Sequence, residues 1–238
     1  MEEKLYQVCS DGKVEEVQKL LQNSQININV QNENDYLQTP FYIACLNGRI
    51  NIVKLLLNDN RVEINKANKY GRTPFYIACY SGYIDIVKLL LSDQRVEINK
   101  ASNDGRTPFY VACRYGQIEI VKLLLNDKRV DINKTSNDGS TPFLIACYNG
   151  KIEVVKCMLE SGRELDINQK DNDGKSGLDY AKQKGNTDIV KLIESFQKNP
   201  SETRANLRRE FGNLILFLFF LEVVNKQQNF QLKDKILF

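Results

Sequence analysis

The sequence predicts an all-α solenoid in which helix-turn-helix repeats are joined by hairpin loops. Thr-Pro-Phe begins at Thr39, Thr73, Thr107 and Thr141, three successive steps of 34 residues. Each copy continues with two short apolar segments, separated by a glycine and spaced as on one face of a helix. Isolated helices shorter than about 12 to 15 residues are marginal in water. We therefore expect the repeats to be stabilised by stacking on their neighbours.

The predicted repeat domain covers residues 1–198, and its first and last copies are degenerate. End repeats of a solenoid need polar outer faces. The first copy offers Lys13, Glu15 and Glu16, and in the last copy Ser176-Gly177 replaces Thr-Pro. The six repeats are expected at about residues 4–33, 34–67, 68–101, 102–135, 136–170 and 171–198.

Each repeat carries local signals for two helices and a turn. Thr is a good N-cap, and Pro at the first helical position loses no hydrogen bond. A second helix follows with the pattern Ile-x-Ile-Val-x-x-Leu-Leu, and Asn-Asp-Gly or Lys-Tyr-Gly before the next Thr-Pro predicts a hairpin turn. The first helices are expected to end where a glycine can adopt left-handed backbone angles, at Gly48, Gly82, Gly116, Gly150 and Gly185.

The composition is that of a soluble protein, and its charge points away from nucleic acid. Hydrophobic residues make up 42% and charged residues 26% of the 238 residues. Residues 198–238 contain seven Lys and Arg residues and four Asp and Glu residues. The rest of the chain contains 26 basic and 26 acidic residues and is therefore neutral. Proteins that bind through phosphate contacts usually carry a basic patch on the folded part, so we do not expect nucleic acid as the partner.

The N-terminus lacks the apolar core of a signal peptide. We therefore expect the protein to be in the cytoplasm, with the nucleus as the alternative.

The repeated frame resembles the ankyrin repeat, whose consensus reads D-x-x-G-x-T-P-L-H-x-A-A-x-x-G-x-x-x-I-V-x-L-L-L-x-x-G-A-D-V-N. The resemblance covers about residues 4–198. The turn after the second helix, Asn-Asp-x-Arg-Val-Glu, is one residue longer than in the family. Leu37 stands where later copies have the hairpin glycine, so the first hairpin is expected to be irregular. The chain has no histidine, and the family's His position holds Tyr42, Tyr76, Tyr110 and Leu144.

Six cysteines raise the question of a disulfide or a metal site. Packed helices lie about 8 to 10 Å apart, whereas a disulfide needs Cα atoms within about 7 Å. There is no Cys-x-x-Cys pair and no His to complete a zinc site. We interpret the thiols as small buried apolar groups. Five of them share one repeat position, namely Cys9, Cys45, Cys79, Cys113 and Cys147, and Cys157 replaces a Leu of a second helix.

No catalytic residue, cofactor or metal is predicted. Without His, a Ser or Cys nucleophile lacks its usual base. The phosphate-binding motifs Gly-x-Gly-x-x-Gly and Gly-x-x-x-x-Gly-Lys-Ser/Thr are both absent from the sequence. Glu97 and Asp131 recur at repeat spacing beside Arg95 and Arg129. We interpret them as surface ion pairs, which contribute little stability individually.

The resemblance implies a protein-binding surface across the hairpin tips and the first-helix face. The corresponding positions flank the hairpin glycine and precede the helix-ending glycine, and they vary between copies while the frame is kept. Tyr and Arg, which dominate interface hot spots, are frequent among them. The predicted partner-binding residues, which we call the tip-and-helix surface, are Tyr36, Lys69, Tyr70, Arg72, Tyr80, Ser81, Arg106, Arg114, Tyr115, Tyr148 and Asn149.

Other residues of the tips and second helices have simpler interpretations. The Asn and Asp residues at the later tips are good turn formers. The Asn of each Val-Asp/Glu-Ile-Asn segment takes a structural role from the resemblance, in which such an Asn bonds backbone between hairpins. These are Asn65, Asn99, Asn133 and Asn168. A row of second-helix lysines, Lys54, Lys88, Lys122 and Lys156, is expected to form a solubilising outer face.

Residues 199–238 form a predicted C-terminal tail, in part helical, with an apolar segment at 214–224. A spanning helix needs about 20 apolar residues, so we expect this segment to cap the last repeat or to meet a partner. Arg208 and Arg209 beside it leave a membrane-associated adaptor as the alternative. An enzyme with a site in the tail would need convergent polar residues that the sequence lacks. We therefore expect a monomeric, non-catalytic adaptor or scaffold that binds a partner protein.

Overall fold

The structure, a computed structural model, describes residues 1–212, so the predicted apolar segment 214–224 lies outside the described residues. The chain divides into two compact units, Met1–Val190 and Lys191–Phe238. Secondary structure in the described part is helical, apart from one isolated bridge between Asn32 and Gln38. The labelled helices are α1 (Glu2–Asp11), α2 (Val14–Leu21), α3 (Pro40–Leu46), α4 (Ile50–Leu57), α5 (Pro74–Ser81), α6 (Ile84–Ser92), α7 (Pro108–Tyr115), α8 (Ile118–Asn126), α9 (Pro142–Tyr148), α10 (Ile152–Glu160), α11 (Gly177–Lys184) and α12 (Thr187–Lys198), and a further helix covers 200–212.

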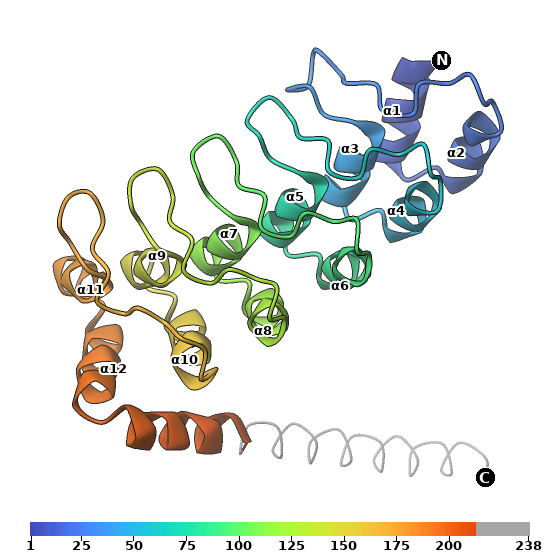
Figure 1. The fold of residues 1–238 in the computed structure, drawn as a ribbon. Helices are drawn as coiled ribbons and strands as arrows, with labels where there is room; N and C mark the ends of the chain where they lie inside the picture. The colour runs from blue at the N-terminus through green and yellow to red at the C-terminus, as the bar shows by residue number, and fades with distance from the viewer. Residues whose placement is uncertain (213–238) are drawn as a thin grey trace, which may run out of the picture. The chain divides into compact units, whose positions relative to one another are not determined.

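Within Met1–Val190 the helices stack in two layers. The first helix of each pair packs on the first helix of the next, from α1 through α3, α5, α7 and α9 to α11. The second helices pack in the same order, from α2 to α10. The loops between successive pairs project as hairpins at one edge of the stack (Figure 1). The predicted all-helical solenoid is confirmed.

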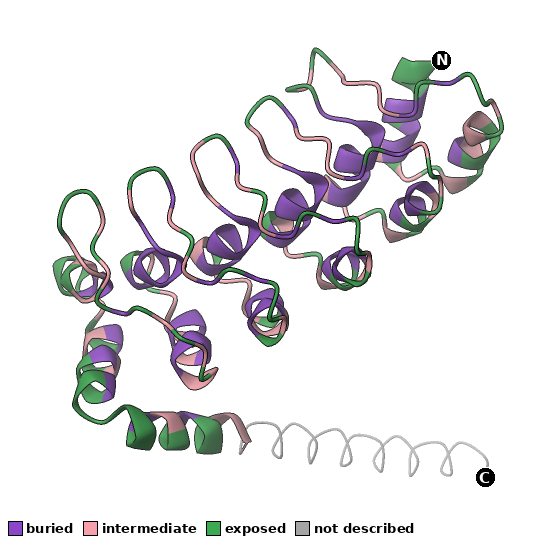
Figure 2. Ribbon diagram, in the orientation of Figure 1, coloured by how far each residue is buried: buried purple, intermediate pink, exposed green. Residues whose placement is uncertain are grey.

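The first helices begin as the Thr-Pro signals predict. The hydroxyl of Thr73 accepts a hydrogen bond from the Tyr76 N–H at 3.1 Å, and that of Thr107 accepts one from Tyr110 at 3.0 Å. Proline occupies the first turn of α3, α5, α7 and α9. These helices are almost wholly buried, because neighbouring repeats cover them on both sides (Figure 2).

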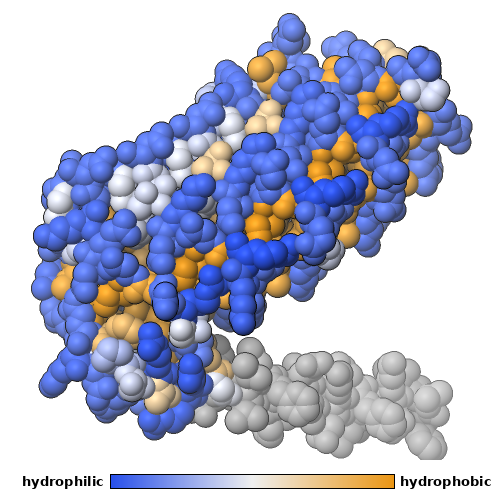
Figure 3. All heavy atoms as spheres, viewed as in Figure 1, coloured by the Kyte–Doolittle hydropathy of each residue, from blue (hydrophilic) through white to orange (hydrophobic). Residues whose placement is uncertain are grey.

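A tight turn connects the two helices of each pair. The backbone N–H of Gln117 reaches back to the carbonyl of Ala112 at 2.9 Å, and that of Lys151 to Ala146 at the same distance. The second helices then bury one apolar face; in α8 it includes Ile120, Val121 and Leu124. Hydrophobic residues form a diagonal band along the stack, bordered by hydrophilic side chains (Figure 3).

An Asp and an Arg in the turn after each central second helix connect two repeats. The Arg95 Nε donates to the Asp93 carboxylate at 3.0 Å, and its Nη2 donates to the other oxygen at 2.6 Å. The same Nη2 also donates to the carbonyl of Leu57, the last residue of α4, at 2.9 Å. Arg95 therefore satisfies a free carbonyl at the end of the preceding repeat's helix.

This pairing corrects the expected partners of the arginines. Asp93 and Asp127 hold Arg95 and Arg129, whereas Glu97 pairs with Lys100 at 3.1 Å. The reason is local: each Asp carboxylate also accepts the backbone N–H of the Arg two residues later, at 2.9 Å in both turns. That turn places the guanidinium beside the Asp. The hydrogen bond from Arg129 holds the pKa of Asp127 below its ordinary value.

Three of the four recurring Asn residues, Asn65, Asn99 and Asn133, connect adjacent repeats as expected. The Asn99 amide donates to the Arg129 carbonyl at 2.7 Å and accepts the Asp131 N–H at 2.9 Å. Asn65 makes the same pair of bonds to the backbone of Arg95 and Glu97. Asn65 and Asn99 thus each satisfy two backbone groups of the repeat that follows, and the Asn133 amide donates to the Glu164 carbonyl at 2.8 Å. We call these Asn residues and the Asp–Arg turns the repeat joints.

The cysteines and the tyrosines at the family's His position lie inside the stack. All six cysteines are buried, as expected. The tyrosines in place of the family's His are buried as well, and Tyr42 accepts a hydrogen bond from the Asn68 amide at 3.2 Å.

The described part of the second unit comprises residues 191–212. Ile193, Phe196 and Leu207 are buried, and the Arg204 guanidinium lies 5.0 Å from the centre of the Phe196 ring. No helix within residues 1–212 is long and apolar enough to cross a membrane.

Candidate functional site

Four predicted residues meet at the first two hairpin tips. The rings of Tyr36 and Tyr70 lie 5.5 Å apart, and the Lys69 ammonium lies 4.3 Å from the Tyr36 ring and 5.1 Å from the Tyr70 ring. The Arg72 guanidinium stands 5.2 Å from Tyr70. Both tyrosines are exposed. The tips therefore present a cationic aromatic cluster to solvent.

The irregular first hairpin holds Tyr36 in this position. Tyr36 and Leu37 both adopt left-handed backbone angles, with φ of 53° and 59°. Such angles are costly for residues other than glycine and persist only where the surroundings impose them. The buried Tyr6 hydroxyl donates to the Asp35 carboxylate and anchors the preceding residue. Burial, assisted by this carboxylate, raises the pKa of Tyr6.

Backbone hydrogen bonds keep neighbouring tips in register. The Lys69 N–H donates to the Tyr36 carbonyl at 2.9 Å, and the Asn103 N–H donates to the Tyr70 carbonyl at 2.9 Å. Gly71 has a φ of 74°, and a Cβ atom there would lie 2.3 Å from the Asn103 side-chain oxygen. The regular tips therefore need glycine both for its angle and for the close approach of the next loop.

A second group of tyrosines lies at the ends of the first helices. Tyr80 of α5 and Tyr115 of α7 form an edge-to-face pair with ring centres 4.6 Å apart. The Arg114 guanidinium lies 5.9 Å from the Tyr115 ring. Tyr148 at the end of α9 pairs edge to face with Tyr180 of α11 at 5.2 Å. Adjacent repeats therefore join their rings in pairs across the stack.

The other predicted residues are more occupied by the protein itself. Arg106 pairs with Asp104 at 2.7 Å and lies 5.8 Å from the buried Tyr110 ring. The Asn149 amide donates to the Ile145 carbonyl at 2.9 Å and so completes the end of its own helix. Ser81 is half-buried at the end of α5. These three residues are less available to a partner than the tyrosines.

Sequence reasoning missed two residues beside Tyr148. Tyr180 contacts its ring, and the Lys184 ammonium lies 4.4 Å from the centre of the Tyr148 ring. The Tyr180 hydroxyl donates to the Asp171 carboxylate at 2.7 Å, and this bond raises the pKa of Tyr180 to about 12. Lys184 directly precedes Gly185, just as Tyr115 directly precedes Gly116, so the two residues occupy the same repeat position. Extending the frame into the last repeat would have found Lys184.

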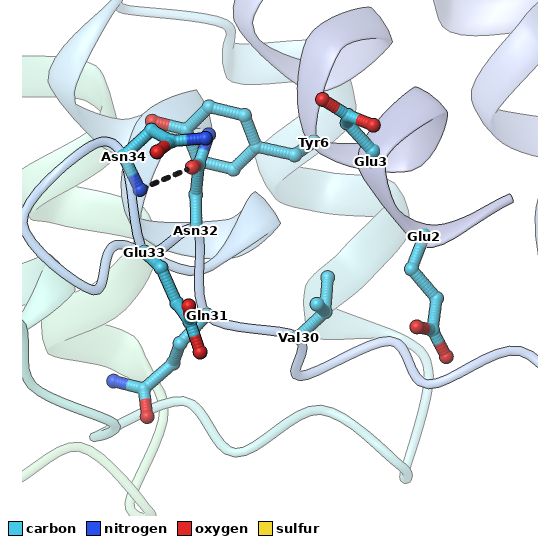
Figure 4. A pocket seen from close by; sticks show the side chains of 8 residues that line it. All are labelled: Glu2, Glu3, Tyr6, Val30, Gln31, Asn32, Glu33 and Asn34. Atoms are coloured by element: carbon cyan, nitrogen blue, oxygen red, sulfur yellow. Dashed lines mark hydrogen bonds between the residues drawn. The ribbon is translucent and has the colours of Figure 1, made fainter.

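A pocket lies beside the first hairpin, and Tyr6, whose hydroxyl anchors Asp35, is one of the residues that line it. It has a volume of about 290 Å³ and lies between α1 and the loop before the first hairpin (Figure 4). The Asn34 N–H donates to the Asn32 side chain at 3.0 Å, and Glu2, Glu3 and Glu33 are also among the lining residues. The tip-and-helix surface contributes no residue to it. Across residues 1–212, His, Cys, Asp and Glu form no group of three that could hold a metal ion.

Comparison with known proteins agrees with the repeat geometry. A family model for ankyrin repeats, which spans three copies, matches residues 5–101, 61–136 and 128–203. These overlapping matches contain every residue of the tip-and-helix surface and both helices of each pair from α3 to α12. No curated protein matches the sequence. With nearly the whole described part covered by the match, the chain belongs to the ankyrin repeat family.

Proposed function

We propose that this chain is an adaptor or scaffold that binds a partner protein through the tip-and-helix surface. Ankyrin repeats are generally protein–protein interaction modules, and the family is typically non-catalytic. The choice of surface rests on its exposed tyrosines. Of the eight large apolar residues that are exposed within residues 1–212, five are Tyr36, Tyr70, Tyr80, Tyr115 and Tyr148.

Exposed rings at these positions are suited to binding. Tyrosine supplies a large contact area with only two rotatable side-chain bonds, so little entropy is lost when a partner covers it. Its hydroxyl can keep a hydrogen bond when the ring is buried. Tyr80 and Tyr115 come from adjacent repeats, so their shared face is fixed by the stacking of α5 on α7. A partner would meet a surface that is already ordered.

The test compares two triple variants in the full chain. Tyr80, Arg114 and Tyr115 are replaced by Ala in the first, and Lys54, Lys88 and Lys122 of the second helices are replaced by Ala in the control. Partners are captured from native extract, identified by mass spectrometry and purified for affinity measurement. The first variant is expected to bind at least about tenfold more weakly, which corresponds to about 1.4 kcal/mol. The control variant should bind like the natural chain.

Unchanged binding by the first variant would refute the proposed surface. Thermal unfolding of both variants is the companion measurement, because a folding defect would also weaken binding. The exchanged rings are exposed, so similar unfolding temperatures are expected. A chain that ends at Lys198 tests whether the repeats alone carry the partner. We propose the cytoplasm as the place where this binding occurs.

A further inference from the structure

The cations among the exposed tyrosines lack acidic partners. Lys69, Arg114 and Lys184 each stand over a tyrosine ring, at 4.3, 5.9 and 4.4 Å from its centre. Throughout residues 1–212, no Asp or Glu carboxylate forms an ion pair with any of the three. Lys69 and Lys184 are exposed and Arg114 is half-buried, so each charge lies beside a tyrosine ring without a carboxylate to neutralise it.

Most lysines of the second-helix row form ion pairs with acids on their own helix. Lys88 pairs with Asp85 at 3.8 Å, Lys122 with Glu119 at 2.9 Å, and Lys156 with Glu153 at 3.1 Å. Each acid lies three residues before its lysine on the same helix. Lys54, the fourth lysine of this row, forms no ion pair within residues 1–212, so three of the row's four lysines are neutralised on their own helix.

Acidic side chains near the tips are largely held by hydrogen bonds. Asp35 accepts from Tyr6, and Asp104 accepts from Ser102 at 2.5 Å besides its pair with Arg106. Asp138 accepts from the Ser136 hydroxyl and the Ser140 N–H at 2.5 and 3.0 Å. Asp173 at the last tip is exposed and lies beyond this pattern. Three of these four carboxylates are therefore already engaged within the protein.

We propose that the partner presents an acidic, extended segment to this surface, with carboxylates at Lys69, Arg114 and Lys184 and apolar side chains over the tyrosines between them. This inference rests on the proposed function and specifies the partner's chemistry. A carboxylate that displaces water from a cation beside a ring forms a charge-assisted hydrogen bond in a partly desolvated place. The complementary charge would also steer the encounter of the two proteins.

The repeat spacing constrains such a segment. Packed helices lie about 8 to 10 Å apart, and an extended chain advances about 3.3 Å per residue. About three residues of the segment would therefore cross each repeat. Arg114 and Lys184 belong to α7 and α11, which are two repeats apart. Acidic residues that meet both would be separated by about six positions.

Nucleic acid is the competing ligand class, because aromatic rings with nearby cations also bind bases and phosphates. The charge balance favours protein. Residues 1–197 carry 26 basic and 26 acidic side chains, so the repeats have no net positive charge. Affinity driven by phosphate contacts usually needs a basic patch.

The experiment selects displayed random peptides of about twelve residues, enough to cross four repeats, on the full-length chain. Enriched peptides are then synthesised and measured against three proteins. These are the natural chain, a variant with Lys69→Gln, Arg114→Gln and Lys184→Gln, and a matched control with Lys54→Gln, Lys88→Gln and Lys122→Gln. Both variants lose the same formal charge. Each peptide is also measured with Glu and Asp replaced by Gln and Asn, and polyuridylate oligonucleotide is measured in parallel.

We expect the enriched peptides to be more acidic than the starting library. Their affinity for the Lys69/Arg114/Lys184 variant should be at least about tenfold weaker than for the natural chain, and their affinity for the control variant should be unchanged. The neutralised peptides should bind the natural chain at least about tenfold more weakly than the acidic ones. Enriched peptides of ordinary composition, no enrichment at all, or tighter binding of polyuridylate would overturn the inference. Neutral peptides that are lost on Tyr80→Ala/Tyr115→Ala would refute the acidic segment and leave the proposed function standing.

Discussion

The repeat joints and the tip-and-helix surface use similar residue types in opposite ways. At a joint, Arg129 is held by the Asp127 carboxylate and by the Leu91 carbonyl, at 2.7 and 2.8 Å. On the tip-and-helix surface, Arg114 lies over the Tyr115 ring without an acidic partner in the described chain. The difference indicates that joint residues contribute to folding, and it agrees with our proposal that the surface residues bind a partner. Substitutions that separate stability from binding test this division.

The largest loss of stability is expected for Asn99→Ala. The substitution leaves the Arg129 carbonyl and the Asp131 N–H without their partner, and two hydrogen bonds contribute about 2 kcal/mol to the free energy of unfolding. Urea denaturation measures the difference. Asn126→Ala, at the exposed end of α8, is the matched control and should change little. Equal destabilisation by Tyr80→Ala would break the division.

A smaller loss than for Asn99→Ala is expected for Arg129→Ala, because a partly exposed ion pair adds little stability and the hydrogen bond to the helix end adds the rest. Lys88→Ala removes only an exposed pair on one helix, for which about 0.3 kcal/mol is expected. The same urea titrations compare them. If both variants lost equal stability, the hydrogen bond to the Leu91 carbonyl would contribute nothing between repeats.

The smallest effect at neutral pH is expected for Asp127→Asn, whose amide oxygen can still accept the Arg129 N–H. Its signature is pH dependence. The hydrogen bond from Arg129 lowers the pKa of Asp127 in the folded state, so the natural chain gains stability above the unfolded pKa of about 3.9 and loses it as the pH falls through the folded pKa. Unfolding free energies from pH 7 to below 4 should therefore fall less steeply for the variant. Identical slopes would contradict the assignment.

Signals within a few residues of each other made the fold predictable. Thr107 and Pro108 specify where α7 begins, and Leu37 in place of glycine predicted an irregular first hairpin. The joints were less predictable, because Arg95 reaches a carbonyl of the preceding repeat. Arg95 pairs with Asp93 and not with Glu97 because the turn places its guanidinium beside Asp93. The sequence pattern alone does not show that turn geometry.

The candidate surface was predictable where copies could be compared. Tyr80 and Tyr115 occupy variable positions of a well-kept frame, and the structure brings their rings together. Tyr180 was missed because it aligns with Ile77 and Ile145, a position that is buried in the other copies, so the comparison of copies did not mark it as a surface residue. The sequence also did not predict that the Asn149 amide would bond the Ile145 carbonyl, because this bond depends on how α9 ends. Whether the surface binds a partner stays a prediction.

The repeat joints also determine which amide protons should exchange slowest with solvent water. Each joint connects only adjacent repeats, so an end repeat has one neighbour to hold it and a central repeat has two. Opening is therefore expected to begin at an end and to reach α5 and α7 late. Tyr80 and Tyr115 lie on these two helices. Their edge-to-face pair would survive partial opening of the stack, so the central rings stay in place while the ends fluctuate.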